Sequence, residues 1–310
     1  MRILFTGASS FTGFWFVKTL KQAGHELTCP LSGSDARYTG VRKRRYQSLR
    51  ELCQTIPDAP FGSKSFIDIL RHCGPFDLLC HHGADVANYR SPDFDPWSAL
   101  QNNTRNITEV LGVLKASTDT PAVVLTGTVF ECDEGAGTEP LRAFSPYGLS
   151  KGLTFQTFRY FCERAEVPLG KFVVPNPFGP FEEERFTAYL CRSWREGKIP
   201  VVKTPDYSRD NIPVDLLARC YALFCHRTTH ERQPLTKVNP SGYIETQGAF
   251  ASRVAKELAP RTGWDCRLSV QKQTDFTEPM VRVNTEPATI LSPDWNETGF
   301  WDQFSRYYAD

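Results

Sequence analysis

Short apolar runs alternate with longer stretches of helical period along the first half of the chain. Runs of strand length lie at residues 2–7, 25–31 and 76–84. Segments whose apolar positions repeat with the period of an α-helix lie at 11–24 and 102–117. This order of strand and helix predicts a parallel β-sheet covered by helices on both faces. We therefore expect an α/β fold, a doubly wound parallel sheet of the Rossmann type.

The pattern changes after two further apolar runs, at 121–130 and 171–176. Beyond them the sequence becomes rich in proline, glycine and aromatic residues, as expected for a smaller lobe at the carboxyl edge of the sheet, where α/β proteins bind ligands. We expect a dinucleotide-binding domain at 1–175, joined by about 211–240, and a C-terminal α/β substrate lobe at 176–310.

Composition and charge narrow the classes of partner. The chain has 310 residues, 40% hydrophobic and 23% charged, enough to bury a large core. Its net charge of +1 gives no general reason to expect nucleic acid or an anionic membrane as a partner. No apolar stretch is long enough for a membrane span or a secretory signal, so we expect a cytoplasmic protein. The ten cysteines are scattered without a Cys-x-x-Cys pair, and we expect no metal site.

The turn after the first strand has the pattern of a dinucleotide-binding loop. Gly7 stands at the turn and Gly13 where the following helix packs on the strand. Backbone N–H groups at such a helix start bind a pyrophosphate. Ser10 replaces the middle glycine of the usual pattern, and its hydroxyl offers a hydrogen bond in return. The predicted cofactor contacts of this loop are Gly7, Ser9, Ser10, Phe11, Thr12 and Gly13.

The end of the second strand bears on the choice of cofactor. NAD enzymes usually carry a carboxylate there for the adenosine ribose, but this strand ends near Leu31 and is followed by Ser32, Ser34 and Arg37. These side chains, with the basic run at 41–46, favour a 2′-phosphate, so we expect NADP(H). Asp35 as a displaced ribose ligand is the argument for NAD(H).

Six segments, in order along the chain, resemble the extended short-chain dehydrogenase/reductases that act on nucleotide sugars. That family includes UDP-galactose 4-epimerase, the dTDP-glucose dehydratases and the 4-keto-sugar reductases. The resemblance covers residues 1 to about 220, and the last 90 match loosely. The segments are TGASSFTG at 6–13, DLLCHHGA at 77–84, VLTGTVFE at 124–131, YGLSK at 147–151, PNPFGP at 175–180 and SRDNIPVDLLA at 208–218.

The resemblance implies a catalytic set of three residues, Thr126, Tyr147 and Lys151. Tyr147 and Lys151 are four apart, so they share one helix face. A free tyrosine titrates near pH 10, and a neighbouring ammonium favours the phenolate. Tyr147 would act as acid and base, Lys151 would tune it and bind the nicotinamide ribose, and Thr126 would orient the reacting oxygen of the sugar.

Further site residues follow from the same resemblance. Asn176 and Arg209 would hold the substrate diphosphate, and Thr128 would also contact the substrate. Gly83, Ala84 and Pro175 would contact the cofactor, together with Tyr147 and Lys151.

The residues around Thr126 restrict the reaction. The family's dehydratases carry an Asp-Glu pair where this chain has Gly127 and Thr128. The epimerase-reductase that makes GDP-fucose uses a cysteine and a histidine where this chain has Thr128 and Phe181. Without these ionisable groups both reactions are disfavoured.

Two reactions at carbon 4 of a nucleotide sugar remain. We favour reduction of an NDP-4-keto-6-deoxyhexose with NADPH over NAD-dependent 4-epimerisation, because the ribose carboxylate is missing and Ser10 replaces a glycine. A further alternative is a reductase of a non-nucleotide carbonyl, which would not need Arg209. Retention of Tyr147 and Lys151 argues against a cofactor-binding sensor. Family members often pair through the helix carrying these residues, so we expect a homodimer.

Overall fold

The computed structural model describes residues 1–86, 88–274 and 276–310. The chain forms two compact units, each built from three segments. The first unit comprises Met1–Glu134, Arg142–Val174 and Ala218–Val238, and the second comprises Gly135–Leu141, Pro175–Leu217 and Asn239–Asp310.

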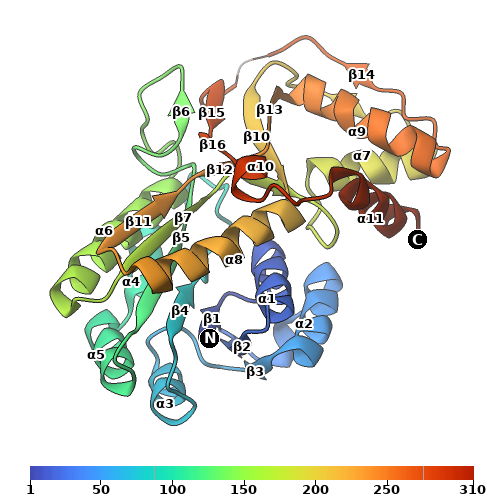
Figure 1. Cartoon of the computed structure of the whole chain (residues 1–310). Helices are drawn as coiled ribbons and strands as arrows, with labels where there is room; N and C mark the ends of the chain where they lie inside the picture. Colours follow the sequence, from blue (N-terminus) through green and yellow to red (C-terminus); the bar gives the residue numbers. More distant parts are fainter. Residues whose placement is uncertain (87, 275) are drawn as a thin grey trace. The chain divides into compact units, whose positions relative to one another are not determined.

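The first unit is built on a seven-stranded sheet in which every neighbouring pair is parallel. The strand order is β11-β7-β5-β4-β1-β2-β3 (Figure 1). This confirms the predicted Rossmann-type α/β fold. The strands are β1 (Arg2–Thr6), β2 (Glu26–Pro30), β3 (Gln54–Ile56), β4 (Leu78–His81), β5 (Ala122–Thr128), β7 (Leu169–Val174) and β11 (Leu235–Val238).

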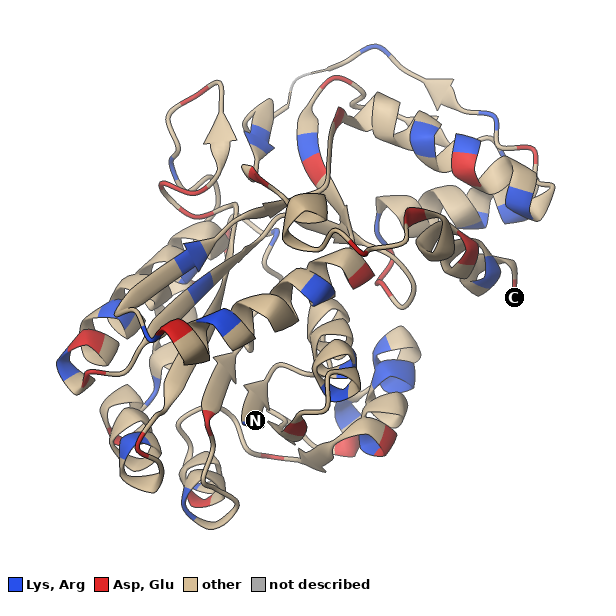
Figure 2. Cartoon of the chain, viewed as in Figure 1, with Lys and Arg blue, Asp and Glu red and all other residues tan. Residues whose placement is uncertain are grey.

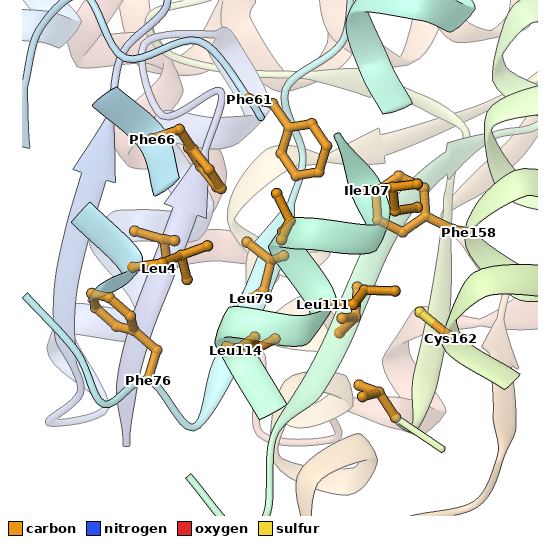
Figure 3. Close-up of a cluster of buried hydrophobic side chains, with 14 of the residues drawn as sticks. Leu4, Phe61, Phe66, Phe76, Leu79, Ile107, Leu111, Leu114, Phe158 and Cys162 are labelled. Atoms are coloured by element: carbon orange, nitrogen blue, oxygen red, sulfur yellow. The ribbon is translucent and has the colours of Figure 1, made fainter. Parts of the chain in front are cut away.

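Helices cover both faces of this sheet. One face buries a cluster in which Leu4, Leu79 and Leu125 of the sheet pack with Phe66 and Phe158 from helices (Figure 3). Burial of such side chains from water is the main stabilising contribution to the fold. The helices of this unit are α1 (Phe11–Gln22), α2 (Gly40–Leu52), α3 (Lys64–His72), α4 (Pro96–Thr104), α5 (Ile107–Ser117), α6 (Pro146–Ala165) and most of α8 (Val214–Glu231).

The opposite face carries α1 and α8 and is packed mainly with aromatic rings. Phe16 of α1 stacks on Tyr221 of α8 with ring centroids 4.0 Å apart. Both rings also meet Phe172 of β7, at 5.8 and 4.9 Å. The central strands β5 and β7 are buried along almost their whole length, as expected for a parallel sheet covered on both faces.

The helical segment expected at 102–117 is interrupted. Helix α4 ends at Thr104 and α5 begins at Ile107. Between them Asn106 adopts a left-handed conformation, φ 51°, and its Nδ2 donates a hydrogen bond to the carbonyl oxygen of Gly62 at 2.8 Å. Asparagine tolerates this conformation better than most residues, and the helical pattern ends where its side chain binds a residue far away in the sequence.

The second unit has a mixed five-stranded sheet. Its order is β13-β10-β15-β6, and β8 pairs with β10. Aromatic residues dominate its core, among them Phe178, Trp194 and Trp301. Its larger sheet contains β6 (Ala136–Gly137), β8 (Asn176–Phe178), β10 (Ser208–Pro213), β13 (Tyr243–Thr246) and β15 (Val281–Val283). Two strand pairs, β9 (Val201–Val202) with β14 (Ser269–Val270) and β12 (Pro240–Ser241) with β16 (Glu286–Pro287), and the helices α7 (Phe186–Arg195), α9 (Gln247–Thr262), α10 (Ala288–Leu291) and α11 (Glu297–Ala309) complete it.

None of the helices in the described part of the chain has both the length and the apolar character that a membrane span requires. All ten cysteines carry free thiols, and six of them are buried.

Two glycines on helices are expected to respond oppositely to alanine. A Cβ on Gly13 would lie 2.2 Å from the carbonyl oxygen of Gly7, whereas a Cβ on Gly112 in α5 meets no atom within 4 Å. Gly13→Ala should lower the free energy of unfolding in urea by about 1–3 kcal/mol. Gly112→Ala should raise it by roughly 0.5–1 kcal/mol, because alanine loses less backbone entropy on folding. A neutral Gly13→Ala would contradict this geometry.

Candidate active site and cofactor loop

The backbone at the end of β1 approaches the end of β4 closely. Gly7 has φ 77°, and a Cβ on it would lie 2.7 Å from the Cα and N atoms of Gly83. The amide of Gly83 donates to the Thr6 hydroxyl at 2.9 Å. Only glycine fits at Gly7, and the chain then turns directly into the N-terminus of the twelve-residue helix α1.

The Ser10 hydroxyl is engaged within this loop. It caps α1 by accepting a hydrogen bond from the amide of Gly13 at 3.1 Å, and it donates to the carbonyl oxygen of Gly7 at 2.9 Å. Serine is a favoured N-cap residue because its oxygen satisfies an orphan amide of the first turn. Phe11, which follows, is buried in the core.

Two arginines of the basic run contact the loop, so the run is more than a solvated helix face. Arg42 donates to the Ser9 hydroxyl from Nη2 at 3.0 Å and from Nε at 3.2 Å. Arg45, which is fully buried, donates from Nε to the carbonyl oxygen of Ser9 at 3.0 Å. Figure 2 shows the concentration of basic positions on α2. Neither arginine was a predicted site residue, although the basic run at 41–46 had been related to phosphate binding from the sequence.

The residues after β2 form a short turn of 3₁₀ helix at Asp35–Arg37, with Ser34 at its N-cap position. Ser32 and Arg37 are exposed, and the Arg37 stem lies where a Cβ on Gly33 would be, 2.5 Å from its Cδ. The Tyr46 hydroxyl donates to the carboxylate of Asp35. Asp35 is therefore engaged by a protein donor.

Lys151 and Thr126 come together at the carboxyl end of β5. Lys151 is buried, and its Nζ donates to the main-chain oxygen of Thr126 at 2.5 Å. Tyr147 lies one turn earlier on α6, which begins at Pro146 behind the N-cap Ser145. Its ring packs against Tyr89 and Phe94, with centroids 5.3 and 6.0 Å away.

The side chain of Thr126 contacts a histidine that was not predicted as a site residue. Thr126 Oγ1 lies 3.0 Å from His82 Nδ1. On the other side of the ring, His82 Nε2 lies 3.0 Å from Ser10 Oγ and 3.1 Å from Thr12 Oγ1. His82 thus joins the glycine-rich loop to the predicted catalytic threonine. The sequence feature that could have pointed to His82 is that a second histidine stands at a position where the family pattern allows any residue.

His81 and Ala84 complete this end of β4. His81 is buried between the Thr6 hydroxyl, 3.1 Å from its Nδ1, and the carbonyl oxygen of Asn103, 3.0 Å from its Nε2. Burial, assisted by the charge of Lys151, lowers the pKa of His81 to about 3. The histidine therefore acts as a neutral structural link, while Ala84 is partly exposed beyond it.

A network of buried charges lies beside Lys151. Lys171 of β7 contacts the Glu131 carboxylate at 2.6 Å and the Glu134 carboxylate at 2.7 Å, and all three side chains are at most 4% exposed. Glu131 also accepts a hydrogen bond from the amide of Thr128 at 2.7 Å. Buried charges are tolerated when they are paired and hydrogen-bonded. Two sequence features could have indicated this network: Lys171 stands within an apolar run, and Glu131 follows the Val-Phe pair.

This network sets the charge state of Lys151. Desolvation lowers the pKa of Lys151 to about 8, the carboxylate of Glu131 raises it, and the ammonium of Lys171 lowers it. Lys151 therefore remains protonated at neutral pH. Gly127 leaves room for these groups, because a Cβ there would lie 2.8 Å from both Glu131 Oε1 and Lys171 Cε.

Three predicted residues belong to the second unit and are described within it. Pro175 is buried, and Asn176 donates from Nδ2 to the side-chain oxygen of Asn211 at 2.6 Å. The Arg209 guanidinium contacts the Glu278 carboxylate at 2.8 Å and donates to the carbonyl oxygens of Ser208 and Pro279. It lies over the ring of Tyr207, 4.8 Å from the centroid, and over Phe276, with which Tyr207 stacks.

Among the described residues no group of three or more His, Cys, Asp or Glu side chains is placed to hold a metal ion. His226 and His230 of α8, which the sequence brings close together, stack on each other with ring centroids 3.7 Å apart.

The model of the NAD dependent epimerase/dehydratase family matches residues 3–235. The chain belongs to this family. The match runs from β1 through β7 and ends at the first residue of β11, and it confirms the resemblance on which the catalytic set was predicted. A search of curated protein sequences finds no match.

Solved structures of this family share the fold over nearly the whole chain. UDP-glucuronic acid 4-epimerase from Bacillus cereus, in complex with UDP-glucuronic acid and NAD, is 18% identical with a TM-score of 0.75, and 99% of each chain is covered. UDP-glucose 4-epimerase from Thermotoga maritima, with UDP-glucose, is 15% identical with a TM-score of 0.73, covering 99% of this chain and 98% of that chain. A UDP-glucose 4-epimerase from Stenotrophomonas maltophila, with bound NAD, is 16% identical with a TM-score of 0.73, covering 100% and 97%.

These neighbours are epimerases, and two of the three are described with NAD. They do not support the reductase or the NADP(H) preference that the sequence favoured. They agree with the alternatives, a 4-epimerase and NAD(H).

Replacing Glu131 by glutamine should shift the pH at which kcat/KM falls on the alkaline side of its pH profile. The rate should fall near pH 8, where Lys151 loses the proton that favours the Tyr147 phenolate. Without the carboxylate that raises the pKa of Lys151, this limb should move to lower pH in the dependence of kcat/KM.

Glu134→Gln is the matched control, because it also removes a carboxylate partner of Lys171, whereas the carboxylate that raises the pKa of Lys151 is that of Glu131. Either change should cost roughly 1–3 kcal/mol of stability, because a buried polar group loses a partner. An unshifted limb in Glu131→Gln would show that Glu131 does not influence Lys151.

Proposed function

We propose that this protein is a nucleotide-sugar 4-epimerase, which inverts carbon 4 through a transient ketone. The contact of Lys151 Nζ with the main-chain oxygen of Thr126 carries the proposal, because it sets the helix that bears Tyr147 against the carboxyl end of β5. Family membership and the epimerase folds of the neighbours support it.

The residues fit a bound nicotinamide dinucleotide. A turn that only glycine fits, followed at once by a helix N-terminus, is the arrangement that binds a pyrophosphate. When bound, the nicotinamide supplies removal and return of a hydride at a sugar carbon. Gly83, after the end of β4, lies beside this turn, and it is proposed as a further contact together with Ala84, which follows it.

The protein's own groups would move the proton. Tyr147 holds the proton exchanged with the oxygen on carbon 4, and Lys151, protonated at neutral pH, favours its phenolate. Thr126 orients that oxygen, and Thr128 lies two residues further along β5, on the same side of the strand. Asn176 and Arg209 are proposed for the substrate diphosphate, which suits a guanidinium.

Tyr147→Phe tests the proposal directly. The wild type should convert UDP-glucose, UDP-glucuronic acid or UDP-N-acetylglucosamine into its 4-epimer, followed by NMR of the sugar. Loss of the phenol should lower kcat by about 10²–10⁴-fold, the usual contribution of an acid–base group. Tyr89→Phe, which removes the neighbouring hydroxyl, is the control and should retain activity.

If the protein forms no epimer but oxidises NADPH when given a 4-keto-6-deoxy nucleotide sugar, the epimerase proposal is wrong and the reductase replaces it. Nucleotide released on denaturation gives an independent answer, because an epimerase retains NAD whereas a reductase must exchange its cofactor at every turnover.

One observation favours the reductase as a second candidate. Arg42 reaches Ser9 in the glycine-rich loop, Arg37 is exposed after β2, and Asp35 is engaged by Tyr46. The guanidinium groups of Arg37 and Arg42, which follow Ser32 and Ser34 along the chain, are of the kind that binds a 2′-phosphate.

Arg42→Ala measures the contribution of this arginine. If the protein is an NADPH-dependent reductase, the change should weaken NADPH binding about tenfold, or roughly 1.4 kcal/mol, and leave NADH binding unchanged. Lys43→Ala, an exposed neighbour on α2, is the control. Equal losses for NADPH and NADH would assign Arg42 to loop stability and remove this support for the reductase.

A homodimer remains part of the proposal. Leu149 and Tyr160 of α6 are 42% and 55% exposed, and Trp97 of α4 is 67% exposed. Exposed large apolar side chains on the helix of Tyr147 support pairing through it.

A further inference from the structure

His82 makes three side-chain contacts that no other residue of the site combines. It follows β4 directly, where the family pattern allows any residue. Its Nε2 lies 3.0 Å from Ser10 Oγ and 3.1 Å from Thr12 Oγ1, and its Nδ1 lies 3.0 Å from Thr126 Oγ1. One ring therefore spans the cofactor loop and the predicted catalytic threonine.

Aromatic packing holds the ring in place and keeps it neutral. Phe16 meets it edge-on with centroids 5.2 Å apart, and Phe5 lies 5.7 Å away. The residue keeps some surface exposure, but loss of hydration, with the charge of Lys151, lowers the pKa of His82 to about 3. At neutral pH the ring has one N–H donor and one bare nitrogen acceptor.

The partners decide which nitrogen carries the proton. The single hydroxyl proton of Ser10 goes to the carbonyl oxygen of Gly7, and Ser10 Oγ also accepts from the amide of Gly13. Toward His82, Ser10 therefore offers lone pairs, so Nε2 is the donor. Nδ1 is then bare and accepts the hydroxyl proton of Thr126.

We propose that His82 is a positioning residue. As the Nε2–H tautomer it donates to Ser10 and Thr12 and accepts from Thr126, so that the glycine-rich loop and the Thr126 hydroxyl form one hydrogen-bonded unit. The inference rests on the proposed function only where it gives Thr126 a role in orienting the sugar oxygen.

The tautomer is measured directly by long-range ¹⁵N–¹H NMR of the full-length protein labelled at histidine. His82→Leu identifies the signal by its loss. Neutral Nε2–H imidazole at pH 7 is the expected result. An Nδ1–H tautomer or an imidazolium would overturn the proposal, whatever the reaction of the protein.

Two polar replacements distinguish the contact that Nδ1 makes from the contacts that Nε2 makes. An asparagine at position 82 places its amide near the site of Nδ1, and a glutamine places its amide near that of Nε2. His82→Leu should lower kcat about tenfold and weaken NADH or NADPH binding roughly threefold, the effect of losing single hydrogen bonds. His82→Asn should recover kcat but not cofactor affinity, and His82→Gln should recover cofactor affinity but not kcat.

His226→Asn, on α8 and in contact with His230, is the control and should change neither property. If all three His82 variants lose kcat and cofactor affinity together, in the order of their thermal stability, His82 only fills space and the proposal fails. The tautomer and the cofactor titrations need no sugar. Absence of turnover on every nucleotide sugar would thus count against the proposed function alone.

Discussion

The site depends on the parallel register of β1, β4 and β5. Thr6 pairs with His81, and His81 pairs with Leu125, so β1 and β4 end side by side, next to the residue of β5 that precedes Thr126. That register brings Gly7 within van der Waals contact of Gly83, at a distance that leaves no room for a side chain. The cofactor loop, the histidine after β4 and the threonine at the end of β5 therefore meet because of backbone pairing, before any polar contact among them forms.

Charge balance is the second constraint on this region. Two buried lysines, Lys151 and Lys171, approach β5 from neighbouring elements, and each needs compensation because an isolated buried ammonium is costly. Glu131 and Glu134 pair with Lys171, and the Glu131 carboxylate also raises the pKa of Lys151. The exposed Lys237 contacts the Glu134 carboxylate at 3.2 Å. Glu131 thereby favours the protonated form of Lys151, which lies on the helix of Tyr147, and this is the state that the proposed chemistry requires.

The proposed epimerase and the alternative reductase would use the same catalytic groups and differ in how they use the cofactor. We therefore expect the difference at the other end of the proposed cofactor site, where Arg42 and Arg45 contact Ser9. The geometry of a loop that two arginines contact is compatible both with a retained dinucleotide and with binding of a 2′-phosphate. Retention of the nucleotide separates the two functions, because it depends on affinity and not on the reacting groups.

The sequence by itself determined the α/β class and the turn from Gly7 to Gly13, and it supplied the proposed catalytic set of Thr126, Tyr147 and Lys151. These features are local: apolar periodicity reports burial, and short spacings report turns and helix faces. Only the tertiary structure decided that Asn106 ends a helix, that Arg42 reaches Ser9, and that His82 joins Ser10 to Thr126. The His82 and Arg42 contacts link residues more than 30 positions apart, and the Asn106 break is fixed by a bond to Gly62. Spacing along the chain does not encode such contacts, because the packing of strands and helices creates them.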